Sequence, residues 1–138
     1  MAAPSEYNQK IIDEFRANDG KVGGPFEGMQ MILLTTTGAK SGEKTTTPLV
    51  YSPDGKNMVV IASMGGAPKN PAWYHNIKAH KDVTIDIGNG EFAAEAIEAL
   101  GDTRDALYAA QAAKYPAFAE YEKKTTRKIP VIVLSAKA

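Results

Sequence analysis

Apolar residues recur at helical spacing near the start of the chain. Between residues 5 and 18, Tyr7, Ile11, Ile12 and Phe15 alternate with charged side chains, a pattern typical of one amphipathic helix. The charged face of this helix carries both signs, whereas helices that anchor proteins to membranes present a basic face. The pattern therefore predicts a helix that packs on the body of the protein and weighs against membrane association.

After a glycine-rich loop at residues 20–28, the pattern changes to short apolar or alternating runs, which are typical of β-strands. Gly88-Asn89-Gly90 joins two of these runs and predicts a hairpin, and Pro53-Asp54-Gly55 predicts a second tight turn. The predicted strands are Met29–Thr35, Pro48–Tyr51, Asn57–Ser63, Val83–Ile87, Glu91–Ile97 and Ile129–Leu134.

Two helices are predicted between the last two strands. The first runs from residue 102 or 103 to about residue 114, and Pro116 separates it from a shorter helix that reaches residue 124. Strands and helices do not alternate as βαβ units. An α+β protein with a barrel-like sheet therefore fits the sequence better than a Rossmann fold.

Composition narrows the classes of function. The 138 residues contain no apolar run near the length of a membrane span and predict one domain over residues 1–138. The 16 basic residues balance 16 acidic ones, so nucleic-acid binding is not expected. The absence of cysteine excludes disulfides, thiolate catalysis and cysteine-based metal sites. No signal-peptide pattern begins at Met1, and we expect a cytoplasmic protein.

The segment at residues 62–76 joins a strand, a glycine turn and the start of a helix. Its glycines, Gly65 and Gly66, let backbone N–H groups approach a ligand closely. We expect Asn70 to cap a helix whose first residue is Pro71. An aromatic ring, a hydroxyl and an amide follow within one turn and suit a planar, phosphorylated cofactor; they belong to Trp73, Tyr74 and Asn76.

A second segment, at residues 38–47, combines glycines, hydroxyls and two lysines that are able to hold a phosphate. It is not a P-loop, because Glu43 rather than glycine precedes Lys44, and Pro48 with a strand follows where a helix is required. The alternative interpretation is an exposed hairpin loop whose lysines are merely solvated.

Other groups point less clearly to chemistry. His75 and His80 lack the spacing of a metal site, and we expect surface or helix-packing residues. Ser63 has no assignable base, so hydrolytic chemistry is poorly supported. A set of three aromatic residues spaced three apart is either core packing or an aromatic wall for a flat substrate; it consists of Tyr115, Phe118 and Tyr121.

Five motifs in the same order and spacing resemble the deazaflavin-dependent nitroreductase family from about residue 28 onward. They are residues 35–42 (TTTGAKSG), 46–49 (TTPL), 62–66 (ASMGG), 70–76 (NPAWYHN) and 126–131 (TRKIPV). The resemblance implies a split β-barrel similar to flavin-nucleotide-binding barrels, with about six antiparallel strands. It places the helix at residues 5–18 before the barrel and cofactor groove at residues 29–135.

The resemblance also implies that the groove binds coenzyme F420, which has a planar deazaflavin ring, a phosphodiester and a carboxylate-bearing tail. The implied cofactor-binding residues are Ala39, Lys40, Ser41, Lys44, Thr45, Thr46, Thr47, Pro48, Ile61, Ala62, Ser63, Met64, Gly65, Gly66, Trp73, Tyr74 and Asn76. The implied substrate-binding residues are Val50, Tyr115, Phe118 and Tyr121. Candidate proton donors are Ser63, Tyr115 and Tyr121, and no metal is expected.

Two departures from the family pattern bear on this site. Members commonly carry arginine where this chain has Ala39 and Thr45. A lysine that replaces such an arginine offers a point charge, and not the two parallel hydrogen bonds of a guanidinium. Lys44 and Lys69 are candidate substitutes. Phe118 stands where nitroimidazole-reducing members often have tyrosine, so activation of nitro drugs is not expected.

The resemblance thus predicts an oxidoreductase in which F420H2 donates hydride to a flat electrophile such as an enone, a quinone or a related conjugated or nitro compound. Two alternatives stay open. One is an F420-binding protein without substantial catalysis, and the other is an FMN-dependent relative with the same barrel. We expect a monomer, with a homodimer as the alternative.

Overall fold

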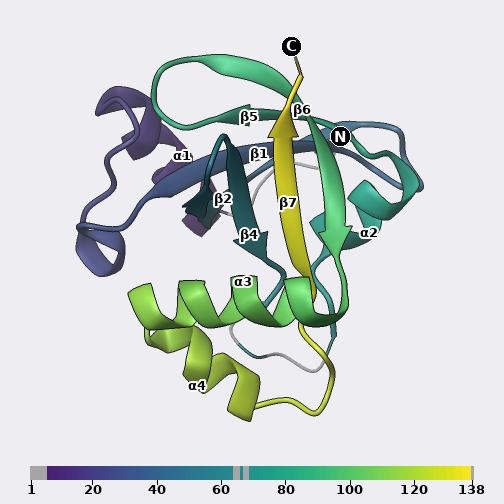
Figure 1. Ribbon diagram of the computed structural model, residues 1–138. Helices are drawn as coiled ribbons and strands as arrows, with labels where there is room; N and C mark the ends of the chain where they lie inside the picture. The colour runs from purple at the N-terminus through teal and green to yellow at the C-terminus, as the bar shows by residue number, and fades with distance from the viewer. Residues whose placement is uncertain (1–5, 64–65, 67–68, 138) are drawn as a thin grey trace.

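The computed structural model describes residues 6–63, 66 and 69–137 (Figure 1). Seven strands form one sheet in the order β2-β1-β5-β6-β7-β4-β3, and every neighbouring pair is antiparallel. The strands are β1 (Met31–Thr37), β2 (Lys44–Val50), β3 (Ser52–Asp54), β4 (Asn57–Ile61), β5 (Asp82–Asp86), β6 (Glu91–Ala99) and β7 (Val131–Ala136).

The sheet curls on itself, because its two edge strands are consecutive in the sequence. Only Tyr51 separates β2 from β3, although these strands lie at opposite ends of the strand order. Tyr51 is also buried in the interior. Figure 1 shows the result, in which β1 and β5 run across the direction of β4, β6 and β7.

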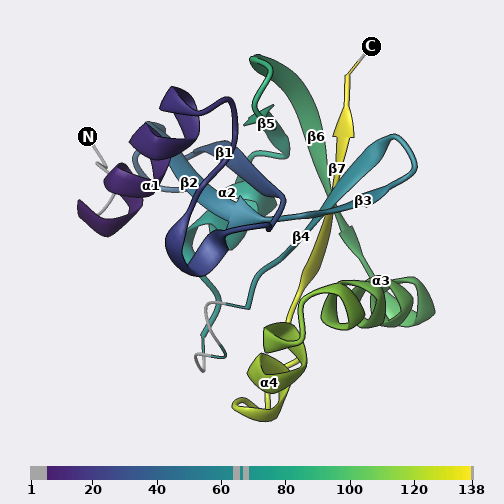
Figure 2. The ribbon, with the colours of Figure 1, turned by 90° about the vertical axis from the view of Figure 1, so that its left-hand side faces the viewer.

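Four α-helices surround the sheet, and a short 3-10 turn spans Gly24–Phe26. Figure 2 shows α3 and α4 together at one end of the molecule, away from α1. The helices are α1 (Glu6–Ala17), α2 (Ala72–Ala79), α3 (Gly101–Lys114) and α4 (Ala117–Lys123). In the part of the chain that the structure describes, none of these helices has the length and apolar character needed to cross a membrane.

The alternation of side chains along each strand separates three apolar clusters. From β1, Ile32 and Leu34 point into the barrel, whereas Met31 and Leu33 pack against α1. From β4, Met58 and Val60 point inward, whereas Val59 and Ile61 pack beneath α3 and α4. Each helical layer thus covers an outer face of the same sheet. Val50 of β2 packs against both the cluster beneath α1 and the cluster beneath α3 and α4.

Most of the elements predicted from the pattern are present, including the hairpin at residues 88–90 between β5 and β6. The predicted sheet of about six antiparallel strands is confirmed, and its seven strands include one that the pattern did not predict, β3. This strand has three residues, one of them Pro53, and carries little apolar pattern. Its hairpin to β4 turns at Gly55, where φ is +62°. The strand predicted to begin at Pro48 begins four residues earlier, at Lys44. The prediction missed its first residues because they are mostly threonines of an edge strand and show no apolar alternation.

The prediction that Asn70 caps α2 was wrong. The helix begins at Ala72, its N-cap residue is Pro71, and no side chain caps it. The side chain of Asn70 instead accepts a hydrogen bond from Arg127 Nη1 at 2.7 Å. Asn70 therefore bonds to a residue that is distant in the sequence, and not to the first turn of α2.

Candidate functional site

A groove follows the free edge of β2, opposite the start of α2. Two hollows of about 430 Å³ and about 640 Å³ share Thr47, Ala72 and Trp73 in their walls. Because they share these three residues, the two hollows adjoin each other, and we describe them as two halves of one groove. We call the end near residues 38–41 the polar half and the end near α4 the apolar half.

The polar half is built on the turn between β1 and β2. Gly38 N donates to Glu43 O at 2.7 Å, and Gly42, with φ at +74°, donates to Gly38 O at 3.0 Å. A Cβ on Gly38 would come too close to Ser41 Oγ, so a larger residue there would require the Ser41 side chain to turn away. The residues that line this half are Gly38, Ala39, Lys40, Ser41, Thr45, Thr47, Ala72, Trp73, His75 and Asn76.

Asn76 fixes this turn to α2. Its Oδ1 accepts a hydrogen bond from Ala39 N at 3.0 Å, and its Nδ2 donates to Thr36 Oγ1 at 3.1 Å. Thr36 is buried beneath the turn. Through these two bonds Asn76 sets the width of the polar half, because it joins the two elements that form its walls.

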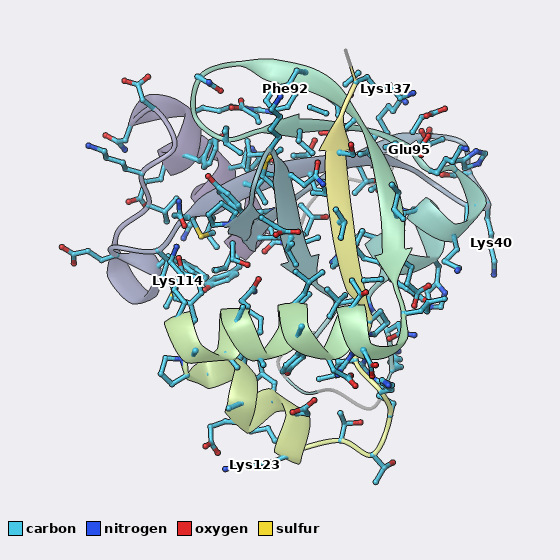
Figure 3. All side chains as sticks on the ribbon, viewed as in Figure 1. Lys40, Phe92, Glu95, Lys114, Lys123 and Lys137 are labelled. Atoms are coloured by element: carbon cyan, nitrogen blue, oxygen red, sulfur yellow. The ribbon has the colours of Figure 1, made fainter. Side chains whose placement is uncertain are left out.

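The register of β2 decides which of its side chains reach the groove. Thr45 and Thr47 line it. Lys44 and Thr46 lie on the other face of the strand, where Lys44 Nζ donates to Thr37 Oγ1 at 2.9 Å and the hydroxyls of Thr46 and Thr35 are 2.8 Å apart. Among the described residues, the lysine that lines the groove is therefore Lys40, and neither Lys44 nor Lys69 joins it. Figure 3 shows Lys40 projecting outward on the side of the molecule where α2 lies.

The apolar half lies between β2 and α4, and aromatic rings dominate its wall. Phe118 and Tyr121 meet edge to face, with ring centroids 5.3 Å apart and an interplanar angle of 78°. Trp73, which is 6% exposed, stands where the two halves meet. The lining residues are Asn8, Phe26, Thr47, Pro48, Leu49, Val50, Ile61, Ser63, Pro71, Ala72, Trp73, Phe118 and Tyr121.

Several residues predicted for the site lie elsewhere. Tyr115 is packed beneath α3 and α4, and its hydroxyl oxygen accepts a hydrogen bond from Gln30 N at 3.0 Å. Tyr74 turns to β6, where its hydroxyl donates to the Glu98 carboxylate at 3.0 Å. Ala62 is fully buried in the barrel interior. Met64 and Gly65, also predicted to bind the cofactor, lie outside the described residues.

Arg127 shapes the groove, although no local pattern assigned it a role. Its Nη2 donates to the carbonyl oxygens of Ser63, at 2.9 Å, and Ala62, at 3.2 Å, while its Nη1 holds Asn70. Burial lowers the pKa of Arg127 from its ordinary value, and the guanidinium nevertheless stays charged. Arg127 thus ties the exit of β4 to the entry of α2, the two ends of the loop beside the groove. The motif at residues 126–131 was the only sequence signal of its importance.

The wall that carries Tyr121 is held from two sides. Tyr108 donates a hydrogen bond of 2.5 Å to Phe118 O, and burial raises the pKa of Tyr108 to about 12, so its hydroxyl keeps its proton. On the other side, Gly66 packs against the end of α4 with φ at +86°. A Cβ at Gly66 would lie 2.9 Å from both Lys124 Cβ and Tyr121 O. Gly66 is therefore needed for packing as well as for its backbone conformation.

Replacing Gly66 by alanine is expected to lower the free energy of unfolding by about 2–4 kcal/mol, because both the positive φ and the contact with α4 oppose a side chain. Gly55→Ala is the matched control, since Gly55 has φ at +62° but a Cβ added there would meet no atom within 4 Å. The control should cost only about 1–2 kcal/mol. Urea unfolding measures the free energy of unfolding of both variants. Equal losses would show that the contact of Gly66 with α4 does not limit the residue at this position.

Known proteins are similar to this chain in both sequence and fold. The family described as F420H(2)-dependent quinone reductase matches residues 8–136. An F420H(2)-dependent quinone reductase of Mycobacterium tuberculosis is 36% identical over 125 residues, which cover 88% of this chain and 84% of that protein. A solved F420-H2 dependent reductase (FDR-A) superposes with a TM-score of 0.71 at 38% identity, covering 77% of this chain and 94% of that one.

Two further solved structures extend the likeness. One, described as a domain-swapped dimer, has a TM-score of 0.72 at 35% identity and covers 94% of this chain and 95% of its own. An FAD-binding protein from Mesorhizobium loti is 14% identical with a TM-score of 0.52, covering 94% of this chain and 87% of that one, a likeness of fold alone. The curled antiparallel sheet with its N-terminal helix is a split β-barrel, which confirms the α+β fold class.

Proposed function

The chain belongs to the F420H2-dependent quinone reductase family, and we propose that its groove holds coenzyme F420 and presents the reduced cofactor to a quinone. The observation that carries this proposal is that the two hollows of the groove adjoin each other. A polar half with a lysine and hydroxyls meets an aromatic half, and Trp73 lines both. A cofactor with an anionic tail and a flat ring requires these two environments side by side.

The residues present fit the parts of F420. In the polar half, Lys40, Ser41, Thr45 and Thr47 offer a cation and hydroxyls to a phosphodiester, and Asn76 keeps the turn in place. At Gly38 the Ser41 hydroxyl lies close against the backbone of the turn. In the apolar half, a flat ring would lie along residues 61–63 and against Trp73.

When bound, F420H2 supplies a hydride, so a quinone that accepts the hydride and a proton becomes a quinol. The task of the chain is to position the two flat molecules and to provide the proton. Ser63 and Tyr121 bear hydroxyls and line the aromatic half without also lining the polar half, and we propose them as proton donors in place of Tyr115. Phe118 and Phe26 exclude water from the same end.

Stopped-flow oxidation of F420H2 by a panel of quinones and enones tests the function. We expect saturable binding of the cofactor and turnover of quinones. Saturable binding without turnover of any acceptor would support the alternative of a cofactor-binding protein without substantial catalysis. A yellow protein with a flavin spectrum on purification would instead support the FMN-dependent alternative.

Lys40→Ala is expected to weaken F420 binding by about 1.5–3 kcal/mol, because it removes a charge-assisted hydrogen bond to the phosphodiester. The matched control is Lys44→Ala, since the ammonium of Lys44 lies on the other face of β2. Fluorescence titration of oxidised F420 measures both affinities. Equal affinities of Lys40→Ala and the wild type would exclude Lys40 from the site.

Tyr121→Ala is expected to lower turnover about 10-fold or more while changing the Kd of F420 little, because we propose that Tyr121, which lines the apolar half, contacts the substrate. Tyr121→Phe separates the ring from the hydroxyl: it keeps the wall and removes one proton donor. Steady-state kinetics with a quinone, combined with F420 titration, distinguish these effects. A loss of F420 affinity with turnover unchanged would show that the Tyr121 ring contacts the cofactor and not the substrate.

The remaining expectations concern assembly and location. We propose that residues 1–138 fold as one domain and act as a monomer in the cytoplasm. A solved relative is described as a domain-swapped dimer, so a dimer is the competing state. Light scattering at micromolar concentration distinguishes the two by mass.

A further inference from the structure

We propose that His75 is a second ligand for the anionic tail of the cofactor, lining the polar half of the groove together with Lys40. The inference rests on the proposed function, since it concerns how the same groove holds F420. It changes the role of His75 from the surface or packing residue expected from the sequence to a binding residue. It also offers a replacement for the arginines that the family commonly carries at Ala39 and Thr45.

The placement of His75 carries the inference. It is exposed in the first turn of α2 and lines the polar half together with Lys40, which comes from the β1–β2 turn. The hydrogen bond from Ala39 N to Asn76 Oδ1, at 3.0 Å, joins the immediate chain neighbours of Lys40 and His75. The backbone segments that carry the two basic side chains are therefore held together, and both side chains line the hollow in which an anion would lie.

The charges around His75 favour an external anion as its partner. Among the described residues, no carboxylate pairs with the imidazole, which makes an edge contact with the Tyr74 ring at 5.6 Å. The nearby carboxylate of β6, Glu98, is engaged by the Tyr74 hydroxyl and by Lys78 Nζ at 2.9 Å. Glu43, at the end of the β1–β2 turn, does not line the groove.

The proposed contact predicts a pH dependence of binding. A charged imidazole binds a phosphodiester or a carboxylate more strongly than a neutral one, because its hydrogen bond is then charge-assisted. Affinity for the tail should therefore be higher at pH 5.5 than at pH 8.5. We expect Kd to be about tenfold weaker at high pH, a difference of about 1.4 kcal/mol.

Fluorescence polarisation of oxidised F420 between pH 5.5 and pH 8.5 tests the inference, with His80→Gln as the matched control. His80 is the other histidine of the chain, lies at the C-cap of the same helix, and does not line the groove. We expect an about tenfold pH step in Kd for the wild type and for His80→Gln, and a reduced step for His75→Gln. His75→Lys should bind F420 at pH 8.5 as tightly as the wild type does at pH 5.5, which a merely structural role would not produce.

A second ligand separates the tail from the ring. The deazaflavin riboside, which lacks the phosphodiester and the carboxylates, should show the same pH dependence with the wild type and with His75→Gln. An unchanged F420 pH step in His75→Gln, or an equal effect of His75→Gln on riboside binding, would overturn the inference while leaving the F420 site intact. Failure of the wild type to bind F420 at any pH would instead overturn the proposed function itself.

Discussion

Trp73→Ala is expected to weaken F420 binding about 30- to 100-fold, a loss of about 2–3 kcal/mol, and to lower the free energy of unfolding by about 3–5 kcal/mol. Trp73 is the aromatic residue that belongs to both halves of the groove, and it also packs in the barrel interior. Its removal takes away a flat surface for the deazaflavin ring and opens a cavity beneath it. No other single change in the groove is expected to affect binding and stability together to this extent.

Two further variants separate these effects. Trp73→Phe keeps an apolar ring in the barrel and should recover most of the stability but only part of the affinity. Tyr74→Phe changes the adjacent residue, whose hydroxyl bonds to Glu98 away from the groove, and should leave F420 affinity unchanged. Urea unfolding and F420 titration measure both quantities. Wild-type affinity in a folded Trp73→Ala protein would show that the ring does not bind at this junction.

Arg127→Met is expected to lower the free energy of unfolding by about 2–4 kcal/mol and to weaken F420 binding as well. The guanidinium holds the carbonyl oxygens of Ala62 and Ser63 and the side chain of Asn70. Methionine keeps much of the apolar stem and removes all of these bonds. The loop between β4 and α2 then loses the tie that brings its two ends together.

The neighbouring residue provides the control for Arg127. Lys128 is exposed and pairs with Asp105 at 3.6 Å, so Lys128→Ala should change stability by no more than about 1 kcal/mol and leave F420 binding unchanged. Chemical unfolding and F420 titration again measure the outcome. If Arg127→Met binds F420 as the wild type does, the loop is positioned without the guanidinium and Arg127 serves stability alone.

The parts of the fold that the sequence predicted are those with local causes. The hairpin at Gly88-Asn89-Gly90 and the break at Pro116 follow from turn chemistry and from the backbone of proline. The start of β2 was missed because threonines on an edge strand carry no apolar alternation. The strand β3 was missed because three residues are too few to show a pattern.

The site was predicted as a region, but not residue by residue. Tyr115 shares a spacing of three with Phe118 and Tyr121, yet α3 ends at Lys114 and α4 begins at Ala117, so the three rings do not lie on one helix. Likewise, spacing alone does not reveal which threonines of β2 face the groove, because strand register decides this.

Long-range bonds set the rest of the site. Arg127 contacts partners 57 to 65 residues away, and no local pattern encodes such a pairing. His75 was taken as a surface or packing residue for a related reason. Its proposed role depends on Lys40, 35 positions earlier in the chain, lining the same half of the groove.

The free edge of β2 has a consequence for the fate of the protein at high concentration. An unpaired strand edge invites a second chain to add a strand, which is a common route to aggregation. On β2 this edge contains Pro48, which has no N–H to offer to an incoming strand. The same proline that interrupts the pattern of donors lines the apolar half of the groove. The open side of the barrel is thereby left accessible to a small molecule while remaining a poor template for another polypeptide.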